Sequence, residues 1–189
     1  MEMRETAWNT ALWLQFGAAI DMLENALVAC PDSLWHKRLW RVPPDDSVPP
    51  ESAAFWYLTY HALFWLDLYL SGSVEGFAPP APFTLAELDP TGVVPERPYT
   101  KEELRTYLAS LRQKCHAILV GLTDEQARRT VAYPWSRGQA SSYLELVLYT
   151  MRHVQEHAAQ LSLFLGQHAV SDTGPSWVAR AQMEPGGQR

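Results

Sequence analysis

Residues 141–165 read SSYLELVLYTMRHVQEHAAQLSLFL and form the longest uninterrupted helical pattern in the chain. Apolar and aromatic side chains recur three and four positions apart from Leu146 to Phe164, as on the inward face of a helix. His153 and His157 belong to the same face and stand one turn apart. The stretch predicts a helix from about Ser141 to Leu165, which Gly166 ends.

Three further helices are predicted from apolar residues at helical spacing, over about residues 6–29, 51–71 and 100–122. Gly72 is a natural stop for the second helix, and Thr100 with Glu103 forms a capping box that starts the third. Residues 72–100, between these two helices, contain six prolines, which exclude a long helix. Because long loops in compact domains are usually functional, this segment is a candidate wall of a site.

Four long helices without a strand signal predict an all-α protein, specifically a four-helix bundle with a long proline-rich crossover between helices two and three. A chain of 189 residues is long enough for one domain with a buried core, which we place at residues 1–170. Residues 171–189 are expected to form a tail that is partly packed or disordered. Trp177 indicates that part of this tail returns to the bundle.

The composition excludes several classes of partner. The 15 basic and 21 acidic residues give a net charge of −6, and the basic residues form no stripe, so no nucleic-acid partner is expected. No apolar stretch reaches the ~18 residues of a membrane span, and the first residues lack the layout of a signal peptide. Cys30 and Cys115 show no metal-ligand spacing and are expected to be reduced thiols. A cytoplasmic protein without a membrane partner is expected.

His61 lies in the middle of the aromatic second helix, on the same kind of inward face as His153 and His157. An unpaired imidazole on such a face costs on the order of 1–3 kcal/mol. One divalent ion, Zn²⁺, Ni²⁺ or Fe²⁺, would satisfy all three rings and keep a position for water or substrate. The alternative is that the rings are hydrogen-bonded or solvated without a metal. The other histidines are expected to play no part in chemistry: His36, His116 and His168.

Residues 153–157 also read H-x-x-E-H, the pattern of inverted zinc peptidases. That chemistry needs another carboxylate ligand well downstream, within a larger fold. Only Asp172 and Glu184 follow, in a short loop and tail, so a peptidase is disfavoured. Glu156 is instead expected to be solvated or to support a metal ligand through a hydrogen bond.

Residues 149–161, YTMRHVQEHAAQL, resemble the DinB superfamily of four-helix metalloproteins, as do His61 in its aromatic helix and residues 122–125, LTDE. The resemblance extends from the first helix to Leu165. In that family one histidine of the second helix and an H-x-x-x-H pair of the last bind a divalent metal, which implies His61, His153 and His157 as the ligands. Relatives include bacillithiol S-transferases and mycothiol-dependent isomerases.

A metal held by three histidines can bind a thiol as the reactive thiolate, or lower the pKa of bound water. Our leading hypothesis is an enzyme of the S-transferase type, in which a low-molecular-weight thiol attacks a small electrophilic substrate. No side chain is assigned as catalytic, although Gln160 and Glu156 are candidates for supporting the site. The predicted substrate-binding residues are Tyr57, Trp65, Tyr149 and Phe164.

Two other functions stay open. A metal-dependent hydrolase would use the same ligands and would turn over without a thiol. A non-catalytic metal-binding or dimerisation module would have a closed site without a substrate-sized pocket. Bundle helices with broad apolar faces often dimerise, so a homodimer is expected.

Overall fold

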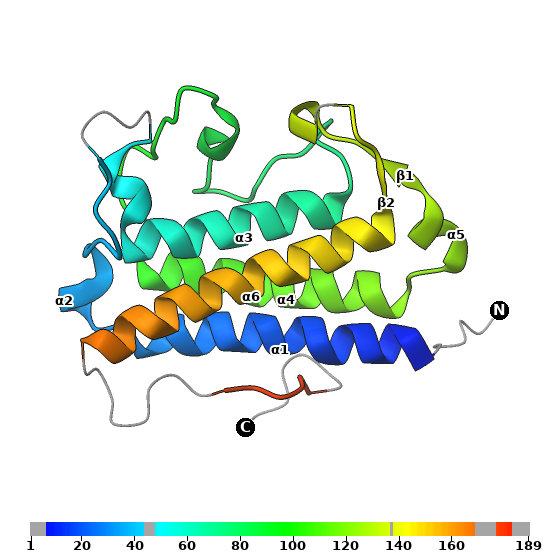
Figure 1. Cartoon of the computed structure of the whole chain (residues 1–189), viewed down its shortest axis with the longest axis horizontal. Helices are drawn as coiled ribbons and strands as arrows, with labels where there is room; N and C mark the ends of the chain where they lie inside the picture. Colours follow the sequence, from blue (N-terminus) through cyan, green and yellow to red (C-terminus); the bar gives the residue numbers. More distant parts are fainter. Residues whose placement is uncertain (1–6, 44–47, 137, 169–176, 183–189) are drawn as a thin grey trace.

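The computed structural model describes residues 7–43, 48–136, 138–168 and 177–182. These residues form helices and one pair of two-residue strands, which confirms the all-α class (Figure 1). The helices are α1 (Ala7–Ala29), α2 (Asp32–Trp35), α3 (Phe55–Ser71), α4 (Lys101–Val120), α5 (Asp124–Arg128) and α6 (Tyr143–Gln167). Shorter 3-10 turns occur at η1 (Pro50–Ala53), η2 (Ala86–Leu88) and η3 (Pro134–Ser136).

The four long helices lie side by side, and α1 and α3 each pack against both α4 and α6 (Figure 1). This pairing is the one expected of the predicted bundle. One buried carboxylate between α3 and α4 is paired with two polar groups of α4, which offsets the cost of burying it. The Tyr107 hydroxyl of α4 donates to Asp67 of α3 at 2.7 Å, and Lys114 Nζ lies 2.6 Å from the same carboxylate.

Helix α3 is the most deeply enclosed element, with only His61, Trp65 and Ser71 of its 17 residues not fully buried. A helix that is apolar almost all round must be covered on every side. Helices α4 and α6 cover part of α3, and the crossover covers another part. His61 and Trp65 are one turn apart, so they define a strip on which α3 stays partly open.

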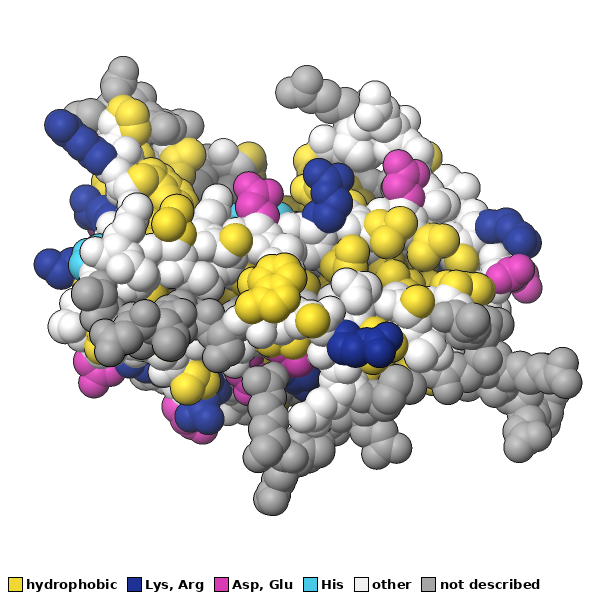
Figure 2. All heavy atoms as spheres, turned by 60° about the horizontal axis from the view of Figure 1, so that its bottom comes forward, with side chains coloured by type: hydrophobic (Ala, Val, Ile, Leu, Met, Phe, Trp, Pro, Cys, Tyr) yellow, Lys and Arg dark blue, Asp and Glu magenta, His cyan; other side chains and the backbone are white. Residues whose placement is uncertain are grey.

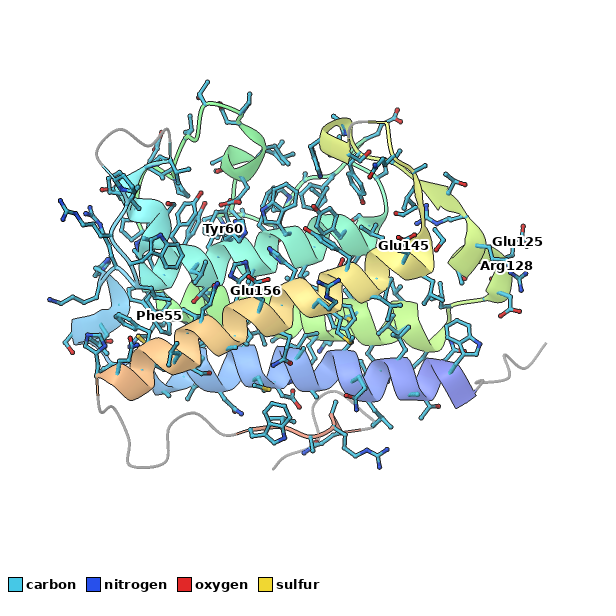
Figure 3. The ribbon with its side chains drawn as sticks, viewed as in Figure 1. Phe55, Tyr60, Glu125, Arg128, Glu145 and Glu156 are labelled. Carbon is cyan, nitrogen blue, oxygen red and sulfur yellow. The ribbon has the colours of Figure 1, made fainter. Side chains whose placement is uncertain are left out.

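The proline-rich crossover between α3 and α4 packs onto the bundle. The Phe83 ring stacks on Tyr107 at 4.3 Å, and the Tyr60 hydroxyl donates to the backbone carbonyl of Thr84 at 3.0 Å. Figure 3 shows Tyr60 on α3, below this segment. The single turn η2 is the crossover's only helical element within residues 72–100, all of which are described, so the predicted absence of a long helix is confirmed.

Most helix ends agree with the sequence analysis. Thr100 and Glu103 form the reciprocal capping box, and Gly72 closes α3 with a left-handed φ of 72°. The prediction that Gly166 ends the last helix is wrong, because α6 continues through Gly166 to Gln167. A glycine in helical conformation costs only about 1 kcal/mol relative to alanine, so packing of the preceding turns can extend the helix past it.

The expectation of no strand is wrong at one point. Residues Thr130–Val131 (β1) and Ser141–Ser142 (β2) pair antiparallel, with Thr130 opposite Ser142 and Val131 opposite Ser141. Two residues are too few to show the alternation that identifies a strand in a sequence. The pair closes a loop that carries Tyr133 and Trp135 toward the C-terminal part of α3, where each makes an aromatic contact.

Residues 177–182 run along α1, as Figure 1 shows. Ala181 donates its backbone N–H to Leu14 at 2.9 Å, and the Trp13 indole donates to the Gln182 carbonyl at 2.7 Å. Trp177 itself is 74% exposed, whereas Ala181 and Gln182 make these hydrogen bonds to α1. Among the described residues, we find no helix with the length and apolar character needed to cross a membrane.

Candidate metal centre

The structure brings together the three histidines that the sequence analysis singled out. His153 Nε2 lies 3.0 Å from His157 Nε2 on the same helix and 3.2 Å from His61 Nε2 on α3. The i, i+4 spacing on α6 accounts for the first distance, and the packing of α6 against the open strip of α3 accounts for the second. All three side chains are partly buried.

Hydrogen bonds determine which ring nitrogens are free. Glu87 Oε2 lies 2.7 Å from His61 Nδ1, and Gln160 Oε1 lies 2.9 Å from His157 Nδ1. Both oxygens are acceptors, so each Nδ1 carries its proton and each Nε2 presents a lone pair. Two lone pairs therefore face His153 Nε2, which has at most one proton to donate. The cluster has too few donors for its close nitrogens, as expected of groups that bind a cation.

The distances between the nitrogens fit a common divalent ion. Zinc–nitrogen bonds are about 2.0–2.1 Å long, so nitrogens 3.0 and 3.2 Å apart can share one ion with about 90–105° between the bonds. One ligand atom from each histidine lies within 4.8 Å of the other two. A donor bonded to His153 Nδ1 would place the ring proton on Nε2. His153 Nδ1 is buried and has no hydrogen-bond partner among the described residues, so its Nε2 lone pair can face an ion.

Burial keeps the rings of α6 neutral. Burial and the neighbouring His157 and His61 lower the pKa of His153 to about 3, and burial with His61 lowers the pKa of His157 to about 4. Burial acts on Glu87 in the opposite sense, but His61 and hydrogen bonds from its neighbours hold the pKa of this carboxyl below its usual value. Neutral imidazoles beside a carboxylate suit a cation, because metal ligands must be deprotonated.

Glu87 is the residue nearest to the histidine cluster that the sequence analysis missed. It lies on η2 in the crossover, its side chain is only 5% exposed, and its Oε2 also accepts a hydrogen bond from Trp65 Nε1 at 2.8 Å. The sequence analysis predicted that the crossover forms a wall of the site, but it did not identify Glu87 within that segment. No local spacing connects residue 87 with residue 61, because the contact depends on how the loop folds back.

Aromatic side chains line one side of the histidine cluster. The Trp65 ring lies 6.2 Å from His61, and the Tyr149 ring stacks on His153 at 6.4 Å. Trp135 contacts Trp65 edge-on at 5.2 Å. We call this set, completed by ring contacts along α3 and the loop after β1, the aromatic wall: Trp65, Tyr69, Tyr133, Trp135 and Tyr149.

The aromatic wall reaches the protein surface, since Trp135 and Tyr149 are 41% and 48% exposed. In Figure 2 the surface is hollowed between two projecting loop regions. The His61 side chain is 28% exposed, so the cluster is in part accessible from solvent. Trp135 and Tyr133 were not predicted, because they come from a loop whose position only the tertiary fold determines.

The other predicted residues lie in different places. Tyr57 is buried beside Glu87, and Phe164 is buried against Phe55, with ring centroids 6.1 Å apart. Phe164 thus belongs to the core near Phe55. Glu156 is exposed on α6 (Figure 3), which agrees with a solvated acid. The downstream acids of the peptidase pattern lie outside the described residues: Asp172 and Glu184.

The comparison with known families agrees with this geometry. Residues 15–161 match the family model described as the DinB superfamily, a span that runs from α1 to α6 and contains all three histidines. Searches of curated proteins and of solved structures return no match. Because the family match covers well over half of the chain, the protein belongs to the DinB superfamily.

Proposed function

We propose that this protein binds one divalent metal ion through His61, His153 and His157. The observation that supports the proposal most strongly is the approach of three Nε2 atoms, 3.0 and 3.2 Å apart, with too few protons to satisfy them. Imidazole suits Zn²⁺, Ni²⁺ and Fe²⁺, and these are the ions we propose. Glu87 and Gln160 orient two of the rings by accepting from Nδ1.

We further infer that the protein is an enzyme that uses a low-molecular-weight thiol to attack a small electrophile. A divalent ion held by three neutral ligands, when bound, supplies the positive charge that lowers the pKa of a thiol. The protein's own thiols are unsuited to the role. Cys30 and Cys115 are both buried, and burial raises the pKa of Cys30 to about 12 and raises that of Cys115 as well. The nucleophile would therefore come from a separate molecule.

The aromatic wall is the proposed binding surface for the electrophile. Its exposed rings are Trp135, which contacts Trp65, and Tyr149, which stacks on His153. Aromatic rings bind apolar and planar groups through burial and edge or stacking contacts. Trp65 and Tyr149, two of the predicted substrate-binding residues, are part of this surface.

Metal content tests the first proposal. The wild type, purified without chelators, is expected to hold about one ion per chain, since the three histidines form a single site. His61→Ala, His153→Ala and His157→Ala should each lose most of it, whereas His36→Ala, which changes an exposed histidine, should keep it. A metal-free wild type, or three variants with unchanged content, would contradict the proposal.

Turnover tests the second proposal. The metal-loaded protein is offered a panel of small thiols with an aromatic chloride electrophile, and separately an activated ester without thiol. Conjugation that needs both thiol and metal supports the S-transferase function. Ester turnover without thiol would instead identify a metal-dependent hydrolase. If neither reaction occurs, the result favours a non-catalytic metal-binding module.

A further inference from the structure

Glu87 is unusual for a residue in a long loop, because its charged side chain is almost completely buried. Its side chain is 5% exposed, and one oxygen, Oε2, accepts from His61 Nδ1 at 2.7 Å and from Trp65 Nε1 at 2.8 Å. Both donors come from consecutive turns of α3. A buried carboxylate is costly unless its hydrogen bonds compensate for lost water. The crossover thus places a charge directly behind one ring of the histidine cluster.

We propose that Glu87 is a positioning residue that holds His61 in its metal-binding orientation and thereby couples the crossover to the metal centre. This inference rests on the proposed metal binding. A carboxylate that accepts from Nδ1 keeps the proton on that nitrogen and directs the Nε2 lone pair toward the other ligands. It also makes the imidazole a stronger donor to a cation.

The second hydrogen bond, from Trp65, gives Glu87 a fixed position. Without it, the carboxylate could rotate about its side-chain bonds. It would then determine which nitrogen of His61 carries the proton, but not the orientation of the ring. With it, Oε2 is held between two points of α3 that lie one turn apart. Trp65 also belongs to the aromatic wall, so one carboxylate connects a metal ligand with a surface proposed to hold substrate.

Coupling between the metal and the crossover follows from reciprocity. If a docked Glu87 strengthens metal binding, bound metal must favour the docked crossover by the same factor. Two other contacts, the Phe83 stack on Tyr107 and the Tyr60 bond to Thr84, hold the residues just before η2 on the bundle. Bound metal would add the Glu87 contact to them. Backbone amides around η2 should therefore open less often when metal is present.

The test compares Glu87→Gln with Glu96→Gln, the same chemical change at an exposed position of the crossover. Zinc affinity is measured by competition with a chromophoric chelator, and hydrogen exchange of residues 83–88 is followed with and without zinc. Glu87→Gln should bind zinc about 10- to 100-fold more weakly, and Glu96→Gln should match the wild type. Zinc should slow exchange around η2 in the wild type and much less in Glu87→Gln.

Nitrogen NMR of the metal-free protein provides an independent measurement. His61 should carry its proton on Nδ1 in the wild type and in Glu96→Gln, and should populate the other tautomer in Glu87→Ala, which lacks the acceptor. Equal zinc affinity in Glu87→Gln and wild type, with unchanged exchange and tautomer, would overturn the inference. If the wild type binds no zinc, the proposed function fails instead, and the tautomer of His61 still decides whether Glu87 positions this ring.

Discussion

His61 and His153 are 92 residues apart in the sequence, and their Nε2 atoms lie 3.2 Å apart across the contact of α3 with α6. The pair exists only when the two helices are packed, whereas His153 and His157 are neighbours in any stretch of helix. An ion that needs all three rings therefore binds the native state far better than the unfolded chain. Metal binding and folding must be linked.

The first prediction is that zinc stabilises the fold. At a free concentration 100 times its Kd, an ion that binds only the native state adds about 2.7 kcal/mol to the free energy of unfolding. Urea unfolding of the wild type in zinc and in chelator measures the difference. The double variant His153→Ala/His157→Ala should show none. Equal stabilisation of both proteins would mean that zinc acts elsewhere.

The second prediction concerns the metal-free protein in acid. His153 and His157 have native pKa values of about 3 and 4, against an ordinary value of 6.5. Well above pH 6.5 both rings are neutral in the native and the unfolded state. Their titration then takes nothing from the free energy of unfolding. As the pH falls below 6.5, the two rings become protonated in the unfolded state but stay neutral in the native state, because their native pKa values are lower. The free energy of unfolding should then drop by at most about 1.4 kcal/mol per pH unit for each ring.

Urea unfolding in chelator between pH 7.5 and 5 tests this dependence. The range stays above the region in which Glu87, whose pKa is lowered, would lose its own contribution on acidification. His153→Gln should have a shallower pH dependence than the wild type, and His36→Gln, at an exposed position, should follow the wild type. Parallel curves for all three proteins would show that burial of these rings does not control the acid response.

The parts of the site that could be predicted are those that depend on helix periodicity. The spacing of His153 and His157 and the aromatic surroundings of His61 are local patterns, and they correctly gave the helices and their inward faces. The capping box at Thr100 is equally local, since both partners lie within one turn.

Most residues of the site that sequence reasoning missed lie in loops, and Tyr69 on α3 is the exception. Glu87 and Trp135 reach the site because the crossover and the loop after β1 fold back onto α3, and no spacing in the sequence encodes that contact. Phe164 shows that helix periodicity alone does not decide whether a residue on the right face lies at the site. It shares the helical face of His157, but α6 is long enough for one face to cover both the site and the core around Phe55.

The third prediction concerns the aromatic wall and rests on the proposed enzyme function. Trp135→Ala removes an exposed ring that contacts Trp65 and leaves the histidines untouched. An aromatic contact is worth about 0.5–1.5 kcal/mol, so KM for an aromatic electrophile should rise about 2- to 10-fold with kcat and metal content nearly unchanged. Steady-state kinetics measure this. Trp40→Ala, at a tryptophan that is 44% exposed, is the control and should leave KM unchanged.

The fourth prediction uses two glycines at helix ends that differ in conformation. Gly72 has a φ of 72°, and a side chain there would meet the Arg129 guanidinium, which lies 4.3 Å over the Tyr143 ring. Gly72→Ala should lower the free energy of unfolding by about 2 kcal/mol, because it combines left-handed strain with the loss of a cation–π contact.

Gly166 lies inside α6, and a Cβ added there would have no heavy atom within 4 Å. Gly166→Ala should therefore raise the free energy of unfolding by up to about 1 kcal/mol, since alanine favours the helix that glycine only tolerates. Urea unfolding of both variants without metal measures the two effects. Both substitutions add one methyl group and reduce the freedom of the unfolded chain alike, so only the native backbone conformation distinguishes them. The two changes in the free energy of unfolding should therefore have opposite signs. A loss of stability in both would mean that α6 does not continue through residue 166.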